Sequence, residues 1–211
     1  MKLLVLGATG ATGRHVVDQA LAAGHDVTVL VRDPARATDG RARLTVVAGR
    51  ATVPEEVEPV VRGQDAVVSV LGPRSKQDPV CPDAATAVVA AMKKHGVKRV
   101  IWLSAGGVGD SKAQIIDASF VFGRIIMPLL LRAPYANHAR AEEILRASGL
   151  DWTVLRPLQL VDTPTGKTAS ATPIGDAKVG GLKIARQDVA AYMLREVVAR
   201  AHVGQMPLLH A

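Results

Sequence analysis

Cysteine and aromatic residues are nearly absent from this chain of 211 residues. The single cysteine, Cys81, excludes an internal disulfide, which is typical of a protein from a reducing compartment. Aromatic residues make up only 3% of the sequence while hydrophobic residues make up 48%, so the core must consist of Val, Leu, Ile and Ala. The length predicts one α/β domain over residues 1–211.

Long apolar runs, clustered basic residues and metal-ligating patterns are also missing. The run at residues 3–6 is too short for a signal peptide, and residues 120–131 fall well short of the roughly 20 residues of a membrane span. Lys and Arg exceed Asp and Glu by 26 to 19, but they are spread along the chain and do not alternate with aromatic residues. We therefore expect a cytoplasmic protein that binds neither nucleic acid nor a membrane and holds no metal. Its positive charge suits a small polyanion such as a dinucleotide.

The first 23 residues carry the strongest signal. An unbroken apolar run at residues 3–6 predicts a strand buried on both faces, and the apolar spacing of Val16, Val17, Ala20 and Leu21 predicts a helix. Between them the glycines follow a G-x-x-G-x-x-G spacing instead of the usual G-x-G-x-x-G. A strand that passes through glycines into a helix presents unpaired N–H groups and a positive helix end, which bind phosphate.

This glycine loop predicts a dinucleotide site. The first glycine makes the tight turn, the second lets a pyrophosphate approach the backbone, and the third lets helix and strand pack closely. Two threonines add hydroxyl groups at the level of the phosphates. The candidate cofactor contacts of the loop are Gly7, Thr9, Gly10, Ala11, Thr12 and Gly13.

The end of the second expected strand favours NADP(H) over NAD(H). About 20 residues after the glycines, where an NAD enzyme places an acidic residue on the ribose, this chain has Arg32, with Arg36 one turn further on. A guanidinium there pairs with a 2′-phosphate and stacks on adenine. The alternative is that both arginines only solvate a loop and that Asp33 contacts the ribose.

Strands and helices alternate along the rest of the chain. This alternation predicts a Rossmann fold, in which a doubly wound and mostly parallel sheet carries helices on both faces. The expected strands are residues 3–6, 27–31, 44–48, 66–71, 99–103, 152–156 and 206–209, and the expected later helices are residues 54–62, 79–95, 136–147 and 187–199.

Ligands of such folds bind at the carboxyl ends of the strands. The candidate contacts at these ends are Leu71, Gly72, Arg74, Ser104, Ala105 and Pro157. Ser104 is a plausible nicotinamide or substrate contact, although a serine there can also simply cap a turn. Residues 162–181 form a polar loop expected on the substrate side. Within residues 110–134, the apolar stretch 120–131 leaves three interpretations open: a lid over the nicotinamide, a dimer face, or an ordinary core helix.

Several motifs together resemble a known family. In chain order they are G-A-T-G-A-T-G, V-L-V-R-D-P-A-R, G-Q-D-A-V-V, S-V-L-G, A-A-M-K-K-H-G-V-K-R-V, L-S-A and H-A-R-A-E-E-I-L-R-A-S-G-L-D-W-T-V-L-R-P. The chain is similar to the NAD(P)H-binding, or NmrA-like, atypical short-chain dehydrogenases/reductases, including their NADPH-dependent flavin reductases. The resemblance implies an NADP-binding Rossmann fold with the nicotinamide over a shallow pocket, and it implies Ser104 and His138 near the substrate. The chain departs from the flavin reductases at Arg50, where they have aspartate, and at Leu158, where they have histidine.

The catalytic pair Tyr-x-x-x-Lys of ordinary short-chain dehydrogenases is also missing. Tyr135 is followed four residues later by Ala139, so no lysine lies one helical turn away to lower the pKa of a tyrosine. This argues against ordinary alcohol dehydrogenation and leaves Ser104, His138 or solvent as the proton source.

Three functions are compatible with this site. The first is a monomeric or homodimeric NADPH-dependent reductase that passes hydride to a flavin, a quinone or a similar conjugated small molecule, since such acceptors need little acid–base help. The second is a non-catalytic NADP(H)-sensing regulator. The third is a nucleotide-sugar epimerase, for which the chain leaves little room for a substrate domain.

Overall fold

The computed structural model describes residues 1–37, 40–73, 75, 78–111, 132–163, 168–173 and 183–211. In chain order its elements are β1 (Lys2–Leu6), α1 (Ala11–Ala22), β2 (Asp26–Val31), the 3₁₀ turn η1 (Pro34–Arg36), β3 (Leu44–Ala48), α2 (Pro54–Val61), β4 (Ala66–Ser69), α3 (Val80–His95), β5 (Arg99–Leu103), the 3₁₀ turn η2 (Gly109–Ser111), α5 (Arg132–Arg146), β6 (Asp151–Pro157), β7 (Gln159–Val161), β8 (Ser170–Thr172), β9 (Lys183–Ala185), α6 (Arg186–Ala199) and β10 (Leu208–His210).

The main sheet is doubly wound, as the alternation predicts. Its strand order is β3-β2-β1-β4-β5-β6-β10-β8, and every pairing is parallel except that of β10 with β8. The chain leaves β1 toward β2 and β3, then returns to the other side of β1 to form β4. The strand order therefore reverses between β1 and β4, which is where the crevice of a Rossmann fold lies.

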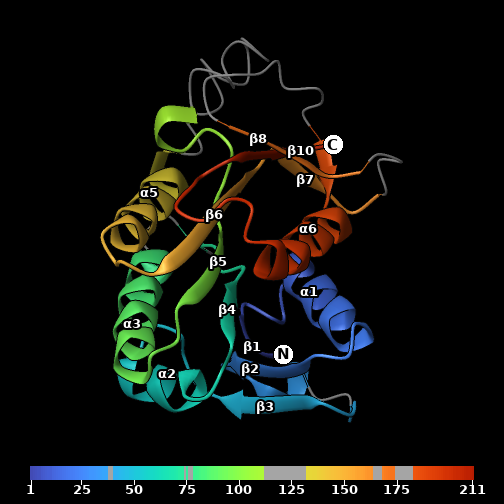
Figure 1. Ribbon diagram of the computed structural model, residues 1–211, viewed down its shortest axis with the longest axis vertical. Coiled ribbons are helices and arrows are strands. Elements are labelled where there is room, and N and C mark those ends of the chain that lie inside the picture. The colour runs from blue at the N-terminus through green and yellow to red at the C-terminus, as the bar shows by residue number, and fades with distance from the viewer. Residues whose placement is uncertain (38–39, 74, 76–77, 112–131, 164–167, 174–182) are drawn as a thin grey trace.

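Helices cover both faces of the sheet (Figure 1). Helices α2, α3 and α5 lie on one face, and α1 and α6 lie on the other. Burial on both faces explains the unbroken apolar run of β1. Leu4 and Leu6 pack in the core under α2, α3 and α5, while Leu3 and Val5 pack in the core under α1 and α6. All four side chains have 0% exposure. The predicted α/β fold class is confirmed.

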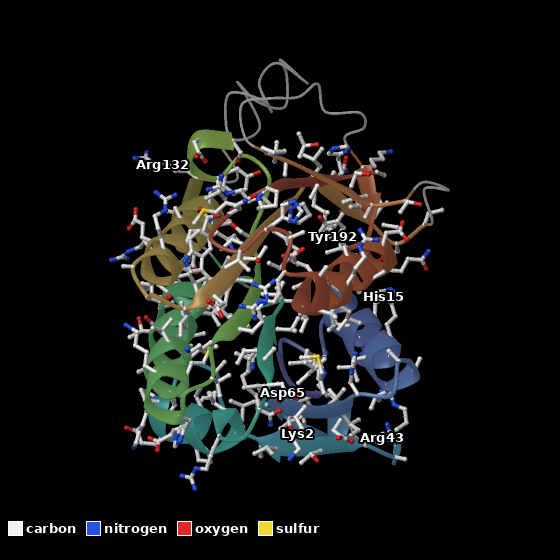
Figure 2. All side chains as sticks on the ribbon, viewed as in Figure 1. Lys2, His15, Arg43, Asp65, Arg132 and Tyr192 are labelled. Carbon is white, nitrogen blue, oxygen red and sulfur yellow. The ribbon has the colours of Figure 1, made fainter. Side chains whose placement is uncertain are left out.

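The edge of the sheet at the amino ends of the strands is held by bonds between side chains and the backbone. The Lys2 backbone N–H donates to Asp65 Oδ2 at 2.7 Å, and the Arg43 guanidinium donates to the Gly24 carbonyl oxygen at 2.5 Å (Figure 2). These contacts tie the starts of β1 and β3 to neighbouring turns. The open crevice lies at the opposite edge, where the strands end.

The structure differs from the sequence-based expectations at some element bounds and in its short strands. Helix α5 begins at Arg132 instead of residue 136, and β10 spans Leu208–His210 instead of residues 206–209. Strand β4 ends at Ser69 and not at residue 71. The Val70 N–H still donates to the Leu6 carbonyl oxygen at 3.0 Å, but Val70 and Leu71 line a cavity. The short strands β7 and β9, which pair in a separate sheet, and β8, at the sheet edge, were not predicted. Strands of three residues contain too little alternation to be recognised.

Two of the predicted regions are described only in part. Strand β8 falls within the polar loop at residues 162–181, of which 164–167 and 174–182 lie outside the described residues. The apolar stretch 120–131 and Arg74 also lie outside them, so the three interpretations of that stretch stay open.

Candidate functional site

The glycine loop joins β1 to α1 with a geometry that only glycine allows at two positions. Gly7 has a φ of +82°, in the left-handed region. A Cβ on Gly13 would lie 2.1 Å from the carbonyl oxygen of Gly7 and 2.8 Å from the Cα of Ala8. The first turn of the helix therefore packs directly on the loop, as the spacing predicts.

The amino end of α1 is left open for an anion. Gly10 is the N-cap, and in the described residues no side chain accepts a hydrogen bond from this first turn. The turn also contains no acidic residue. The N–H groups of Ala11, Thr12 and Gly13 are the ones that an α-helix leaves without an internal partner, and the helix dipole adds positive charge there. This arrangement suits a phosphate group.

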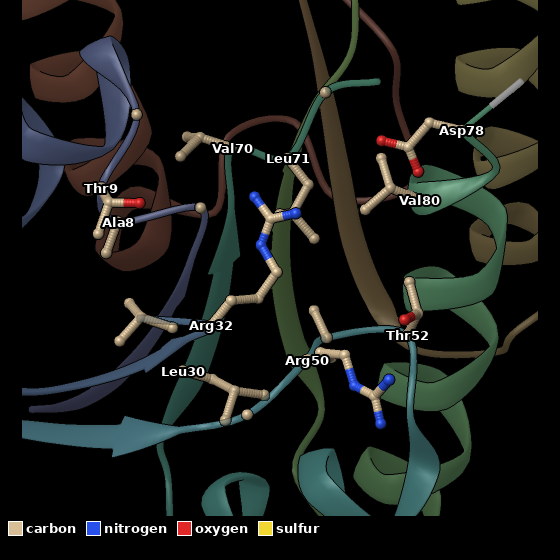
Figure 3. A pocket seen from close by; sticks show the side chains of 16 residues that line it. Ala8, Thr9, Leu30, Arg32, Arg50, Thr52, Val70, Leu71, Asp78 and Val80 are labelled. Atoms are coloured by element: carbon tan, nitrogen blue, oxygen red, sulfur yellow. The ribbon is translucent and has the colours of Figure 1, made fainter. Parts of the chain in front are cut away.

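A cavity of about 260 Å³ lies beside the glycine loop (Figure 3). It opens where β1, β2, β3 and β4 end, at the reversal of strand order. Figure 3 shows Arg32 extending from the end of β2 toward Leu71, with Thr9 on the loop side and Asp78 on the side of α3. The lining residues are Gly7, Ala8, Thr9, Gly10, Leu30, Val31, Arg32, Gly49, Arg50, Ala51, Thr52, Val70, Leu71, Gly72, Asp78 and Val80.

The cavity brings together six of the predicted cofactor contacts: Gly7, Thr9, Gly10, Arg32, Leu71 and Gly72. Three more, Ala11, Thr12 and Gly13, form the first turn of α1 next to it. Ser104 and Ala105 follow β5, and Pro157 ends β6, so these three lie in the other half of the sheet. Arg74 lies outside the described residues.

Arg36 lines a second, neighbouring cavity and not the one that holds Arg32. This cavity has a volume of about 240 Å³ and shares Ala8 and Thr9 with the first. Its other basic residues are Arg14 and Arg41, the latter within 2.5 Å of an Asp18 carboxylate oxygen. The two predicted arginines therefore reach toward the glycine loop from adjacent cavities.

The sequence analysis named Arg50 only as a departure from the flavin reductases and did not count the loop after β3 among the cofactor contacts. Arg50 and Thr52 line the first cavity, and the Arg50 guanidinium lies 3.1 Å from Glu56 Oε1. Hydrogen bonds from the Arg50 side chain and backbone lower the pKa of Glu56. The sequence did contain a signal for this contact, because the loop follows the carboxyl end of a parallel strand, where ligands bind.

The second half of the crevice contains a buried ion-pair network. Ser104 Oγ donates to Glu142 Oε1 at 2.6 Å. Glu142 is held by Arg156, whose Nε and guanidinium amino group donate to its two oxygens at 3.0 and 2.7 Å. Arg156 also pairs with Asp110 of η2. Ser104, Glu142 and Arg156 are 5%, 4% and 1% exposed, whereas the Asp110 side chain is 63% exposed, so the network reaches solvent at Asp110.

Glu142 is the main residue that the sequence analysis did not identify. The charges of α5 are typical of a solvated face, and Glu143 and Arg146 are indeed exposed, but Glu142 points into the protein. The signal was Arg156, a charged residue inside a buried strand, which needs a partner because an unpaired buried charge is very costly.

His138 lies one helical turn before Glu142 and is also buried. Its Nδ1 is 3.8 Å from Cys81 Sγ. Burial lowers the pKa of His138 to about 4, against the opposing effect of Glu142, so the ring is neutral at pH 7. Burial, with a smaller contribution from Asp78, raises the pKa of the Cys81 thiol to about 12. Neither group carries charge near neutral pH.

Tyr135 does not take the place of a catalytic tyrosine. Its hydroxyl donates to the carbonyl oxygen of Gly106 at 2.9 Å, in the loop after β5. Burial raises the pKa of Tyr135, which is opposite to the shift that a catalytic tyrosine needs. Its bond instead holds α5 against that loop.

Two classes of site find no support in the described part of the chain. Its His, Cys, Asp and Glu residues form no group of three that could hold a metal ion. Its helices include none with the length and apolarity to cross a membrane.

Comparisons with known proteins agree with this geometry. A family model described as NAD(P)H-binding matches residues 7–199. The (4-alkanoyl-5-oxo-2,5-dihydrofuran-3-yl)methyl phosphate reductase of Streptomyces griseus subsp. griseus is 30% identical over 210 residues, which cover 96% of this chain and 65% of that protein.

Two solved structures are similar over nearly their whole length. ChuY, an anaerobillin reductase from Escherichia coli O157:H7, matches with a TM-score of 0.79 and 26% identity, covering 100% of this chain and 97% of that one. A short-chain dehydrogenase/reductase from Veillonella parvula DSM 2008, in complex with NADP, matches with a TM-score of 0.82 and 19% identity, covering 100% and 94%. Because the Veillonella parvula structure is only 19% identical to this chain, its match demonstrates a shared fold.

Proposed function

The chain belongs to the NAD(P)H-binding group of the atypical short-chain dehydrogenases/reductases, and from this we propose that it is an NADPH-dependent oxidoreductase that passes hydride to a flavin, a quinone or a similar conjugated acceptor. The observation that carries the proposal is that Arg32 and the glycine loop line one cavity. That cavity pairs a phosphate-binding helix end with a guanidinium where the adenosine ribose would lie.

The arginines support NADP(H) as the cofactor. Arg32 reaches the first cavity, and Arg14 and Arg36 line the adjacent one, so positive charge surrounds the site expected for a 2′-phosphate. One oxygen of the competing ribose contact, Asp33, already has a partner, because its Oδ1 accepts the Ala35 N–H at 3.1 Å and caps η1. An acidic ribose contact is therefore less well supported than a basic phosphate contact.

A conjugated acceptor suits the polar groups of the second half of the crevice. Bound NADPH supplies hydride, and the acceptor also needs a proton. His138 is neutral at pH 7, and the Tyr135 and Ser104 hydroxyl protons are already donated within the protein. Solvent is then the proton source, which is sufficient where charge spreads over a conjugated system. The proteins named above include the reductase of a (4-alkanoyl-5-oxo-2,5-dihydrofuran-3-yl)methyl phosphate, whose name places a ring double bond beside carbonyl groups, and an anaerobillin reductase.

Single-turnover oxidation of NADPH tests the proposal, with FMN and a small quinone offered separately. We expect rapid loss of NADPH absorbance in the wild type and a loss of NADPH affinity in Arg32→Ala. Arg62→Ala, at an exposed arginine after α2, is the matched control and is expected to behave as wild type. An NADPH affinity that is the same in both variants would remove the role given to Arg32.

An NADP(H)-sensing regulator is the second candidate function. It is favoured by the missing Tyr-x-x-x-Lys pair and by the neutral, buried state of His138. Tight binding of NADPH without oxidation by any acceptor in the same experiment would favour the sensor over the reductase.

A further inference from the structure

The single hydroxyl proton of Ser104 is already used in a hydrogen bond to Glu142. A serine hydroxyl has one O–H donor and two acceptor lone pairs. Ser104 Oγ lies 2.6 Å from Glu142 Oε1, and a carboxylate that is paired with a guanidinium only accepts hydrogen bonds. The Ser104 proton is therefore donated to Glu142, which leaves the oxygen lone pairs for a ligand.

Arg156 fixes the orientation of the Glu142 carboxylate toward Ser104. Its planar fork contacts both oxygens of Glu142, at 3.0 Å through Nε and at 2.7 Å through the amino group. Because Arg156 belongs to β6, next to β5, and is 1% exposed, its position is fixed by the sheet. The hydrogen bonds thus run from Arg156 on β6 to Glu142 on α5, and from Glu142 to Ser104 at the end of β5.

Ser104 stands where the second half of a dinucleotide would lie. Arg32 and the glycine loop occupy the β1–β3 side of the reversal point, while Ser104 directly follows β5 on the other side. A dinucleotide that crosses this crevice places its adenosine half by Arg32 and its nicotinamide half toward β5 and β6.

We infer that Glu142 is a positioning residue that sets Ser104 as a hydrogen-bond acceptor, so that this half of the crevice recognises an N–H donor of the ligand. The donor belongs either to the carboxamide of the nicotinamide or to the acceptor molecule. This inference rests on the proposed use of NADP(H). It assigns Ser104 to recognition instead of proton delivery.

The test compares NADP⁺ with its acetylpyridine analogue, in which a methyl group replaces the amide nitrogen and removes its N–H donors. Dissociation constants are measured for the wild type, Ser104→Ala, Glu142→Gln and the double variant. We expect the wild type to prefer NADP⁺ by about fivefold, the value of one hydrogen bond. The preference should disappear in Ser104→Ala.

Glu142→Gln should act through Ser104. An amide has one acceptor oxygen where the carboxylate has two, so it cannot accept from both arms of the Arg156 fork and also hold the Ser104 proton as the carboxylate does. The Ser104 hydroxyl is then no longer fixed as an acceptor. The preference should fall as in Ser104→Ala, and the double variant should fall no further, because coupled residues are not additive. A preference that survives in either single variant while FMN binding is also unchanged, or losses that add in the double variant, would overturn the inference.

A matched control separates positioning from general destabilisation. Glu196, at 2% exposure, forms a comparable buried pair with Arg99 at 3.0 Å. Glu196→Gln should lower thermal stability and leave the preference for NADP⁺ unchanged. If Glu142→Gln does not fold, Ser104→Ala leaves the Glu142–Arg156 pair intact and decides the outcome by itself.

A further measurement shows whether the N–H donor belongs to the nicotinamide carboxamide or to the acceptor molecule. The dissociation constant of FMN for the NADP⁺ complex is measured with the same variants. If the donor belongs to the acceptor, Ser104→Ala weakens FMN binding and leaves the affinities for NADP⁺ and its analogue equal to those of the wild type. No change in either measurement overturns the inference. Each measurement is of binding, so a failure to oxidise NADPH rejects the proposed reductase without deciding this point.

Discussion

The Cβ position of Gly13 lies 2.1 Å from the carbonyl oxygen of Gly7, so α1 can begin where it does only if residue 13 lacks a side chain. Real Cβ atoms do not approach a backbone oxygen so closely. The contact makes the amino end of α1 and the turn after β1 a single rigid unit, on which phosphate binding would depend.

Replacing Gly13 with alanine should disrupt this unit. The added methyl group forces backbone to move, so we expect a lower thermal midpoint and at least about tenfold weaker NADPH binding. Thermal unfolding and fluorescence titration measure the two effects. Gly72→Ala is the stability control, because a Cβ there meets nothing within 4 Å. A Gly13→Ala protein with wild-type affinity would contradict the assignment of the loop.

Replacing Arg32 with aspartate should change the cofactor preference. The carboxylate repels a 2′-phosphate and can accept hydrogen bonds from a ribose hydroxyl. We expect NADPH affinity to fall by about tenfold or more and NADH affinity to rise, measured by titration with each cofactor. Arg62→Asp makes the same change of charge on an exposed residue and should preserve the preference. Equal losses for both cofactors would count against a 2′-phosphate contact.

His138 should make the protein less stable in mild acid. Burial holds its pKa at about 4 in the folded state, below the value of about 6.5 in an unfolded chain. The unfolded chain therefore binds more protons between these values, and the free energy of unfolding falls as the pH falls through that window. The contribution of this histidine is roughly 3 kcal/mol across the window.

Denaturant unfolding at several pH values measures this effect. His138→Gln should flatten the loss of stability in mild acid, whereas His15→Gln, on the partly exposed side of α1, should not. The same steep pH dependence in the His138 variant would show that another group is responsible.

Cys81 should be unreactive in the folded protein. It is 0% exposed, and burial together with Asp78 raises its pKa to about 12, so almost no thiolate is present near pH 7. A thiol reagent such as DTNB should label it slowly in buffer and rapidly in denaturant. Labelling that is equally fast in both conditions would place Cys81 in a locally open part of the protein.

The sequence predicted the fold because its strongest patterns are local. The apolar run of β1 and the spacing of Gly7, Gly10 and Gly13 depend on neighbours in the chain, and both appear in the structure as expected. The separation of Arg32 and Arg36 into adjacent cavities was not predictable, because it depends on the path of the η1 turn.

The polar network was harder to predict for a different reason. Glu142 looks like a solvated helix residue until α5 is packed against β6 and Arg156. A single sequence contains the charges of both residues but not the contact between them. Likewise β7 and β9 are recognisable only as a pair, because each is too short to carry a pattern.

The guanidinium of Arg156 contacts residues from both sides of the segment 112–131. Asp110 of η2 precedes that segment and Glu142 of α5 follows it, and both pair with Arg156. This side chain therefore holds η2 and α5 to β6 at one point. A change at Arg156 should consequently be felt on both sides of that segment at once.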